Sequence, residues 1–209
     1  MACSCNGSHD PRLVVLTGGP GAGKTASLEV IRRRFCEHVR VLPEAATIVF
    51  KGGFPRLPDP SARRAAQRAI YHVERELEAM VLEEKKAAIA LCDRGTLDGA
   101  AYWPGPPHEL FEGVGSSREA ELSRYSTVIH LRVPTAGYNH DNPVRIESLE
   151  EARGIDASIE RAWEGHPRRF FVEESRDFLA KLNRVVELVR AEVPECCRNG
   201  GLAPKMSAT

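Results

Sequence analysis

Residues 18–25 read Gly-Gly-Pro-Gly-Ala-Gly-Lys-Thr and match the phosphate-binding pattern G-x-x-x-x-G-K-[ST]. An apolar run, 13–16, precedes the pattern and a helix-favouring run, 26–31, follows it, which is the strand–loop–helix context that the pattern requires. Glycines let the backbone curl around phosphate oxygens, and the helix adds its positive dipole end. The segment predicts a nucleoside triphosphate site. The alternative, a glycine-rich turn that only connects a strand to a helix, is disfavoured because the spacing, the Lys-Thr pair and the flanks all match the pattern.

Two side chains of this segment have expected roles of their own. Lys24 is expected to reach the β- and γ-phosphates, and the Thr25 hydroxyl is expected to hold Mg²⁺. The expected ligands are therefore ATP or GTP and Mg²⁺. The residues expected to surround the nucleotide are Gly18, Gly19, Pro20, Gly21, Ala22, Gly23, Lys24, Thr25 and Ala26.

Length and charge limit the class of protein. The chain has 209 residues, the size of one domain with or without a small lid. Its 29 basic and 29 acidic residues cancel, so no global field indicates a nucleic-acid partner. No apolar run reaches membrane-spanning length, and residues 1–11 lack the apolar core of a signal peptide. We therefore expect a cytoplasmic protein, and the oligomeric state stays open.

The domain organisation is expected to be simple. Residues 1–11 are predicted to be a disordered arm, 12–193 a nucleotide-binding domain with a lid at about 145–167, and 194–209 a flexible tail. Four of the six cysteines lie in the arm and the tail, and no C-x-x-C pair occurs. A zinc site or a disulfide therefore has little support from the sequence.

Apolar strand segments alternate with helical segments along the chain. The predicted strands are 12–17, 39–42, 87–92, 127–133 and 169–172. The predicted helices are 25–36, 60–86, a short one capped by Thr96, one from Ser116 to Arg124, 148–165, and one capped by Ser175. This alternation predicts an α/β fold with three layers, in which helices cover both faces of a parallel sheet.

Charged residues follow the second and third predicted strands. Glu44 comes directly after the second strand, at the edge where ligands bind in open α/β sheets, and can serve as a general base towards a hydroxyl. From position alone, a surface or helix-capping role for Glu44 is equally open. Asp93 and Arg94 follow the third strand, where an acid assists Mg²⁺ and an arginine can contact phosphate. A structural salt bridge is the alternative for this pair.

Further candidates lie on the predicted helices. Arg145 precedes the helix at 148–165 and Arg153 lies on it, so both can close over transferring phosphates if this helix is a lid. An ordinary amphipathic surface helix is the alternative. Gln67, near the start of the long helix, either contacts a polar edge of a ligand or faces water.

Several stretches together resemble one family of small P-loop domains, related to AAA-like ATPases and kinases. This family includes the TRPL translocation defect protein and domains related to the nicotinamide riboside kinase of NadR. The stretches that carry the resemblance are Leu16–Thr25, Pro43–Ala46, Cys92–Gly95, Asp98, Ala101–Trp103 and Trp163–Pro167. The resemblance covers nearly the whole chain, from about Arg12 to Val193.

The family is similar in plan to deoxynucleoside and nucleoside monophosphate kinases. This similarity implies five parallel strands in the order 2-3-1-4-5, with a helical lid between the fourth and the fifth. By the same similarity Glu44 matches a general base, and Asp93-Arg94 matches an acidic-Arg pair in which the acid is commonly Glu. Arg145 and Arg153 match the lid arginines only loosely, because the helix start and spacing differ. The residues implied to line the acceptor pocket are Gln67, Tyr102, Trp103 and Asp98.

Two functions follow as hypotheses. The favoured one is a kinase that moves the γ-phosphoryl group of ATP to a hydroxyl of a small, nucleoside-like acceptor. The alternative is a GTP- or ATP-dependent binding module without turnover, which would present Arg63, Arg64 and Arg68 to a phosphoinositide or a protein in trafficking. The absence of an N-K-x-D stretch disfavours guanine. An AAA+ remodelling ATPase is less favoured, because the third strand lacks an Asp-Glu pair and the chain leaves no room for a C-terminal helical domain.

Overall fold

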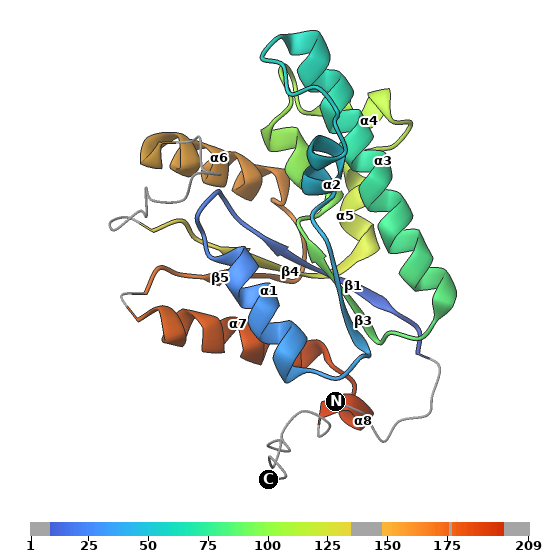
Figure 1. Cartoon of the computed structure of the whole chain (residues 1–209), viewed down its shortest axis with the longest axis vertical. Helices are drawn as coiled ribbons and strands as arrows, with labels where there is room; N and C mark the ends of the chain where they lie inside the picture. The colour runs from blue at the N-terminus through green and yellow to red at the C-terminus, as the bar shows by residue number, and fades with distance from the viewer. Residues whose placement is uncertain (1–8, 135–147, 176, 199–209) are drawn as a thin grey trace.

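A parallel sheet between two layers of helices forms the centre of the molecule (Figure 1). The computed structural model describes residues 9–134, 148–175 and 177–198. Expectations about other residues, including Arg145 and the start of the predicted lid, lie outside the described residues.

The sheet confirms the predicted fold. Its strand order is β2-β3-β1-β4-β5, and every neighbouring pair is parallel. The strands are β1 (Arg12–Thr17), β2 (Val39–Leu42), β3 (Ile89–Asp93), β4 (Tyr125–Leu131) and β5 (Arg169–Val172). In β1, Leu13 and Val15 face one apolar cluster and Val14 and Leu16 face the other. This burial on both sides explains why the strands read as continuous apolar runs.

The two faces carry different helices. One face packs on α1 (Lys24–Arg34) and α7 (Phe178–Glu192) through residues such as Ile31 and Val185. The helices associated with the other face are α3 (Pro60–Glu84), the 3-10 helix η1 (Thr96–Ala101), α4 (His108–Gly113) and α5 (Arg118–Arg124). The lid candidate α6 (Leu149–Ala162) contributes to both clusters, through Ala152 and Ile159. In the described part of the chain, no helix has the length and apolar character needed to cross a membrane.

Short helices account for most differences from the prediction. Neither α2 (Ala45–Lys51) nor α4 was expected, because helices of one or two turns show too little periodicity. The helix α8 (Glu195–Arg198) lies within the segment that the sequence assigns to a tail.

Capping residues define helix starts more closely than the apolar pattern does. Asp59 caps α3, and Ser148 and Glu151 form the expected capping box of α6. The predicted caps of α5 and α7 are wrong, since Ser117 and Asp177 accept the capping bonds instead of Ser116 and Ser175.

A buried hydrogen bond joins the end of α6 to η1. The Trp163 indole Nε1 donates to Asp98 Oδ1 at 2.6 Å, and the ring is fully buried. A Cβ atom on Gly95 would lie 2.7 Å from the same ring, so the chain must have glycine there for the tryptophan to fit. The packing of Trp163 therefore holds the segment after β3 in place.

This packing predicts a stability effect for Trp163→Phe. The variant leaves one oxygen of a buried carboxylate without its donor, so we expect a loss of about 1–3 kcal/mol in unfolding free energy, measured by urea denaturation. Trp103→Phe is the matched control, because its Nε1 lies 3.4 Å from Glu109 Oε2 and donates a weaker bond. Equal losses in the two variants would contradict the role assigned to the Asp98 contact.

Candidate functional site

The P-loop lies at the carboxyl end of the central strand β1 and continues into α1. Gly18 has φ 128°, and a Cβ atom there would lie 2.1 Å from the Leu131 carbonyl oxygen. Gly23, with φ 97°, is the N-cap residue of α1. Glycine suits these left-handed positions, so the backbone geometry explains why the loop has glycine at 18 and 23.

Lys24 is buried within the loop. Its ammonium group donates to the carbonyl oxygens of Gly18 and Gly19, at 2.7 and 3.0 Å. Burial, together with the nearby Arg94 charge, lowers the pKa of Lys24 to about 7. A buried ammonium group that donates to two carbonyl oxygens is well suited to gain a phosphate oxygen as its partner.

The carboxylate expected to assist Mg²⁺ stands next to this lysine. Asp93 ends β3, and its Oδ1 is buried without a hydrogen-bond partner among the described residues. Burial raises the pKa of Asp93 to about 6, although the Lys24 charge opposes this effect. Thr25 is an exposed residue in the first turn of α1. An unpaired carboxylate oxygen and a hydroxyl are the hard oxygen donors that Mg²⁺ prefers, so these residues fit that ion.

Arg94 connects the other candidates to the P-loop. Its Nε donates to Glu44 Oε1 at 2.9 Å, and its Nη1 donates to Asp98 Oδ2 at 3.2 Å and to the Gly18 carbonyl at 3.4 Å. The residue has φ 77°, an unusual value for a side chain of this size. The three hydrogen bonds of the side chain compensate for the strain of this backbone conformation.

Glu44 is partly exposed at the end of β2, and its other oxygen accepts from the Thr47 hydroxyl. Burial alone would raise its pKa, but Arg94 and Thr47 outweigh that effect and lower it. Although Glu44 is the N-cap residue of α2, its side chain makes no capping bond. The structure therefore brings Glu44, Asp93 and Arg94 together near Lys24.

The four residues predicted to line an acceptor pocket lie in different environments. Asp98 is buried and accepts from Thr17, Trp163 and Arg94, so its oxygens are already used within the protein. Trp103 is also buried. Tyr102 and Gln67 are partly exposed, and the Arg94 guanidinium lies 5.6 Å from the Tyr102 ring centre.

A second contact with the P-loop comes from residues that sequence reasoning missed. Asp156, on α6, accepts from the Gly19 backbone N–H at 2.7 Å and lies 2.9 Å from His130 Nε2. The Gly19 backbone also packs closely against α6. A Cβ atom added to Gly19 would lie only 2.8 Å from the Ala152 carbonyl oxygen. A helical pattern with an acid every few residues would not distinguish Asp156 from its exposed neighbours.

A hollow of about 320 Å³ lies beside this contact. It is lined by Arg132, Val133, Arg153, Asp156, Ala157, Glu173 and Glu174. Arg153, predicted as a lid arginine, is exposed at this hollow, and Arg132 is paired with Glu160 through Nη2 at 3.0 Å. The volume of this hollow suits a nucleobase. The hollow adjoins the P-loop because Asp156, which lines it, also accepts from the Gly19 N–H.

Solved structures of other proteins have a similar fold. The chain is similar to a NadR protein in complex with NR, with 16% identity and a TM-score of 0.68 over 96% of this chain and 55% of that one. A NadR protein in complex with NAD and AMP-PNP gives 13% identity and a TM-score of 0.63, over 88% and 50% of the two chains. The chain thus spans about half the length of these NadR chains. Thymidylate kinase from Candida albicans gives 11% identity and a TM-score of 0.58, over 87% of this chain and 92% of that one.

These likenesses and the strand order define the fold as that of P-loop kinases. Residues 13–180 match a family model described as AAA domain, and the chain belongs to this family. No curated protein matches the chain.

The low pKa of Lys24 predicts a pH-dependent stability of the ligand-free protein. The unfolded chain keeps this proton up to the ordinary pKa of 10.5, whereas the folded chain loses it above about 7. Because the unfolded state then binds more protons, this group makes stability rise with pH over that interval, by at most about 1.4 kcal/mol per pH unit.

Urea denaturation of the wild type and of Lys24→Met, between about pH 7 and pH 9, measures this contribution. We expect the wild type to gain stability relative to the variant as the pH rises, since all other titrating groups are common to both. A difference that stays constant over this range would contradict the assignment.

Proposed function

We propose that this protein binds ATP with Mg²⁺ and transfers the γ-phosphoryl group to a hydroxyl of a small, nucleoside-like molecule. The observation that carries the proposal is the Arg94 bridge, which joins the candidate base Glu44 to the P-loop carbonyl of Gly18. A loop that only bound and released a nucleotide would not need a carboxylate held at this place. The NadR and thymidylate kinase neighbours support the kinase assignment through their fold.

The triphosphate would lie along the P-loop, with its γ-phosphate near Lys24. The ammonium group exchanges its two carbonyl partners, Gly18 and Gly19, for phosphate oxygens, and its charge then stabilises the transferring group. Mg²⁺, held by Thr25 and Asp93, supplies further neutralisation of phosphate charge when bound. The hollow beside Asp156 would hold the nucleobase.

The acceptor hydroxyl would approach from the side of Glu44. Its oxygen forms a bond to the γ-phosphorus, the bond to the β,γ-bridging oxygen breaks, and the hydroxyl proton passes to Glu44. In the ligand-free protein Arg94 keeps the pKa of Glu44 low. When a phosphate oxygen also binds the Arg94 guanidinium, Arg94 lowers the pKa of Glu44 less, and the carboxylate becomes a better base.

Other residues would position the reactants. We propose that Tyr102 and Gln67 contact the acceptor, and that Trp103 shapes the pocket from within the core. Asp98 would act by orienting Arg94, because its oxygens already have three donors. The part of the lid on α6 would bring Arg153 towards the phosphates, as we also propose for Arg145.

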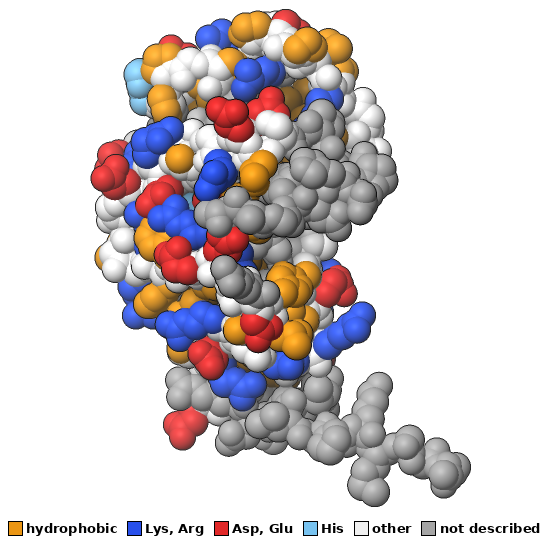
Figure 2. Space-filling view, turned by 90° about the vertical axis from the view of Figure 1, so that its left-hand side faces the viewer, with side chains coloured by type: hydrophobic (Ala, Val, Ile, Leu, Met, Phe, Trp, Pro, Cys, Tyr) orange, Lys and Arg blue, Asp and Glu red, His pale blue; other side chains and the backbone are white. Residues whose placement is uncertain are grey.

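The binding-module alternative requires Arg63, Arg64 and Arg68 to contact an anionic partner, and their contacts give it less support. Arg63 donates to the Tyr102 carbonyl at 2.9 Å, and Arg64 donates to the Pro104 carbonyl at 3.1 Å. These arginines are thus partly used within the chain. On the described face in Figure 2, acidic and basic side chains are interspersed, which is not the pattern of a large anion-binding surface.

Transfer of labelled γ-phosphate tests the proposal directly. The protein is incubated with Mg²⁺ and labelled ATP or GTP, in the presence of nucleosides, nucleotides, nicotinamide riboside or phosphoinositides. A labelled small product identifies the acceptor class. Tight binding of the triphosphate without any labelled product across this panel would favour the binding module instead.

The Glu44→Gln variant separates binding from transfer. We expect ATP affinity to stay near that of the wild type, whereas transfer falls at least about a hundredfold, the usual scale for loss of a general base. Glu187→Gln is the control, because Glu187 is an exposed residue of α7. Unchanged transfer in Glu44→Gln would remove the base role.

Lys24→Ala tests the P-loop itself. Without the ammonium group we expect triphosphate binding to be lost, as isothermal titration calorimetry would measure, because the phosphate loses its central cation. Retained binding at wild-type affinity would show that the nucleotide binds elsewhere.

A further inference from the structure

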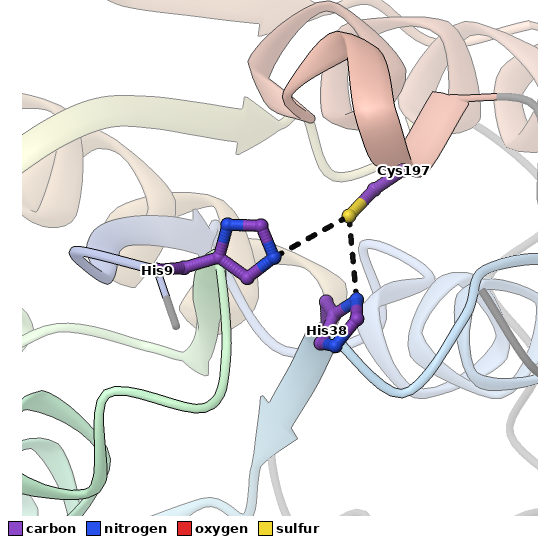
Figure 3. Close-up of side chains that lie close together, drawn as sticks. All are labelled: His9, His38 and Cys197. Carbon is purple, nitrogen blue, oxygen red and sulfur yellow. Dashed lines mark hydrogen bonds between the residues drawn. The ribbon is translucent and has the colours of Figure 1, made fainter. Parts of the chain in front are cut away.

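A second cluster of reactive side chains lies far from the P-loop. His9 precedes β1, His38 directly precedes β2, and Cys197 belongs to α8 (Figure 3). The three converge at the edge of the sheet where the parallel strands begin, whereas the P-loop lies where they end. The six residues of β1 separate the two edges by about 20 Å.

The ligand atoms of this cluster have the spacing of a metal site. Cys197 Sγ lies 3.3 Å from His38 Nδ1 and 3.7 Å from His9 Nε2, and all three atoms lie within 4.8 Å of one another. Tetrahedral Zn²⁺, with bonds of about 2.0–2.1 Å to nitrogen and about 2.3 Å to sulfur, places such atoms about 3.3–3.6 Å apart. The two sulfur–nitrogen distances are close to these values, and the two histidine nitrogens would have to move towards each other to complete the geometry.

The chemistry of the three groups favours a shared cation over hydrogen bonds alone. Two imidazole nitrogens approach a single sulfur atom, and a thiol both donates and accepts hydrogen bonds only weakly. His38 and Cys197 are buried, at 9% and 3% exposure, where weak bonds compensate poorly for lost water. A metal ion accepts a lone pair from each group and stabilises the thiolate.

The backbone holds the two histidines independently of any ion. The His9 N–H donates to the Lys85 carbonyl at 2.9 Å, and the His38 carbonyl accepts from the N–H groups of Ala88 and Ile89. Both histidines are therefore anchored to the segment that leads into β3. Such prior positioning reduces the ordering needed when a ligand binds.

We propose that His9, His38 and Cys197 bind Zn²⁺ and that the ion fastens both ends of the described chain to the sheet. Two further thiols lie close enough to supply a fourth ligand: Cys36 Sγ is 3.8 Å from His38 Nδ1, and Cys196 Sγ is 3.8 Å from Cys197 Sγ. No local motif marks these ligands, because Cys197 is 159 residues from His38 and 188 residues from His9.

Metal analysis of the full-length protein, purified without an added histidine tag, tests the proposal. We expect about one zinc per chain by elemental analysis, and a Co²⁺-substituted protein with a sulfur-to-cobalt charge-transfer band. Cys197→Ser should weaken that band, and His38→Gln and Cys197→Ser should each bind Zn²⁺ at least about tenfold more weakly, because loss of a ligand should exceed loss of an outer-shell partner.

Matched controls are His72→Gln, at an exposed position of α3, and Cys92→Ser, in the core strand β3. Both should keep one metal ion, and circular dichroism checks the folding of every variant. Absence of Co²⁺ binding by the wild type, or equal binding by the site variants and the controls, would overturn the proposal.

A measurement on the wild type alone guards against variants that fail to fold. Zn²⁺ should slow the alkylation of Cys197 by iodoacetamide, mapped by mass spectrometry, while leaving that of Cys92 unchanged. Equal alkylation of Cys197 with and without Zn²⁺ would overturn the proposal.

Discussion

The interactions of the partly buried Arg94 guanidinium hold the candidate site together. This group binds Glu44 from the end of β2, Asp98 from η1 and the Gly18 carbonyl of the P-loop. Buried charges of this kind are costly unless they are paired and hydrogen-bonded on several sides. Because one guanidinium bonds to all three, the end of β2, η1 and the P-loop are held in a common geometry.

The Arg94 network continues into the lid candidate. Asp98 accepts from Trp163 at the end of α6, and Asp156 of the same helix accepts from the Gly19 N–H. The helix therefore contacts the P-loop near its middle, through Asp156, and η1 at its carboxyl end, through Trp163. If α6 moves when a nucleotide binds, these two contacts are the ones that must change, which couples lid position to the state of the loop.

Much of the fold could be predicted from the sequence, because buried parallel strands are continuous apolar runs and the P-loop is a specific pattern. The strand order was implied by the family resemblance, and the structure has that order. Residues 13–180 match an AAA domain family, which agrees with the resemblance. The short helices α2 and α4 could not be predicted, since one or two turns carry little periodicity.

The site was predictable where a residue follows a strand, as Glu44, Asp93 and Arg94 do. It was not predictable where a residue acts through tertiary contacts. Asp156 and Thr17 look like ordinary helix and strand residues, and only packing brings them to the P-loop and Asp98. The same holds for His9, His38 and Cys197, which are remote in sequence.

The central claim is that the site transfers a phosphoryl group to an acceptor other than water. The most direct test uses ATP whose γ-phosphoryl oxygens carry a heavy isotope, with Mg²⁺ and a mixture of small hydroxyl-bearing molecules, followed by mass spectrometry. We predict a small-molecule product that carries the heavy phosphoryl group, in amounts that match the ADP formed. Heavy oxygen found only in inorganic phosphate, in amounts that match the ADP, would mean hydrolysis and would contradict the kinase assignment.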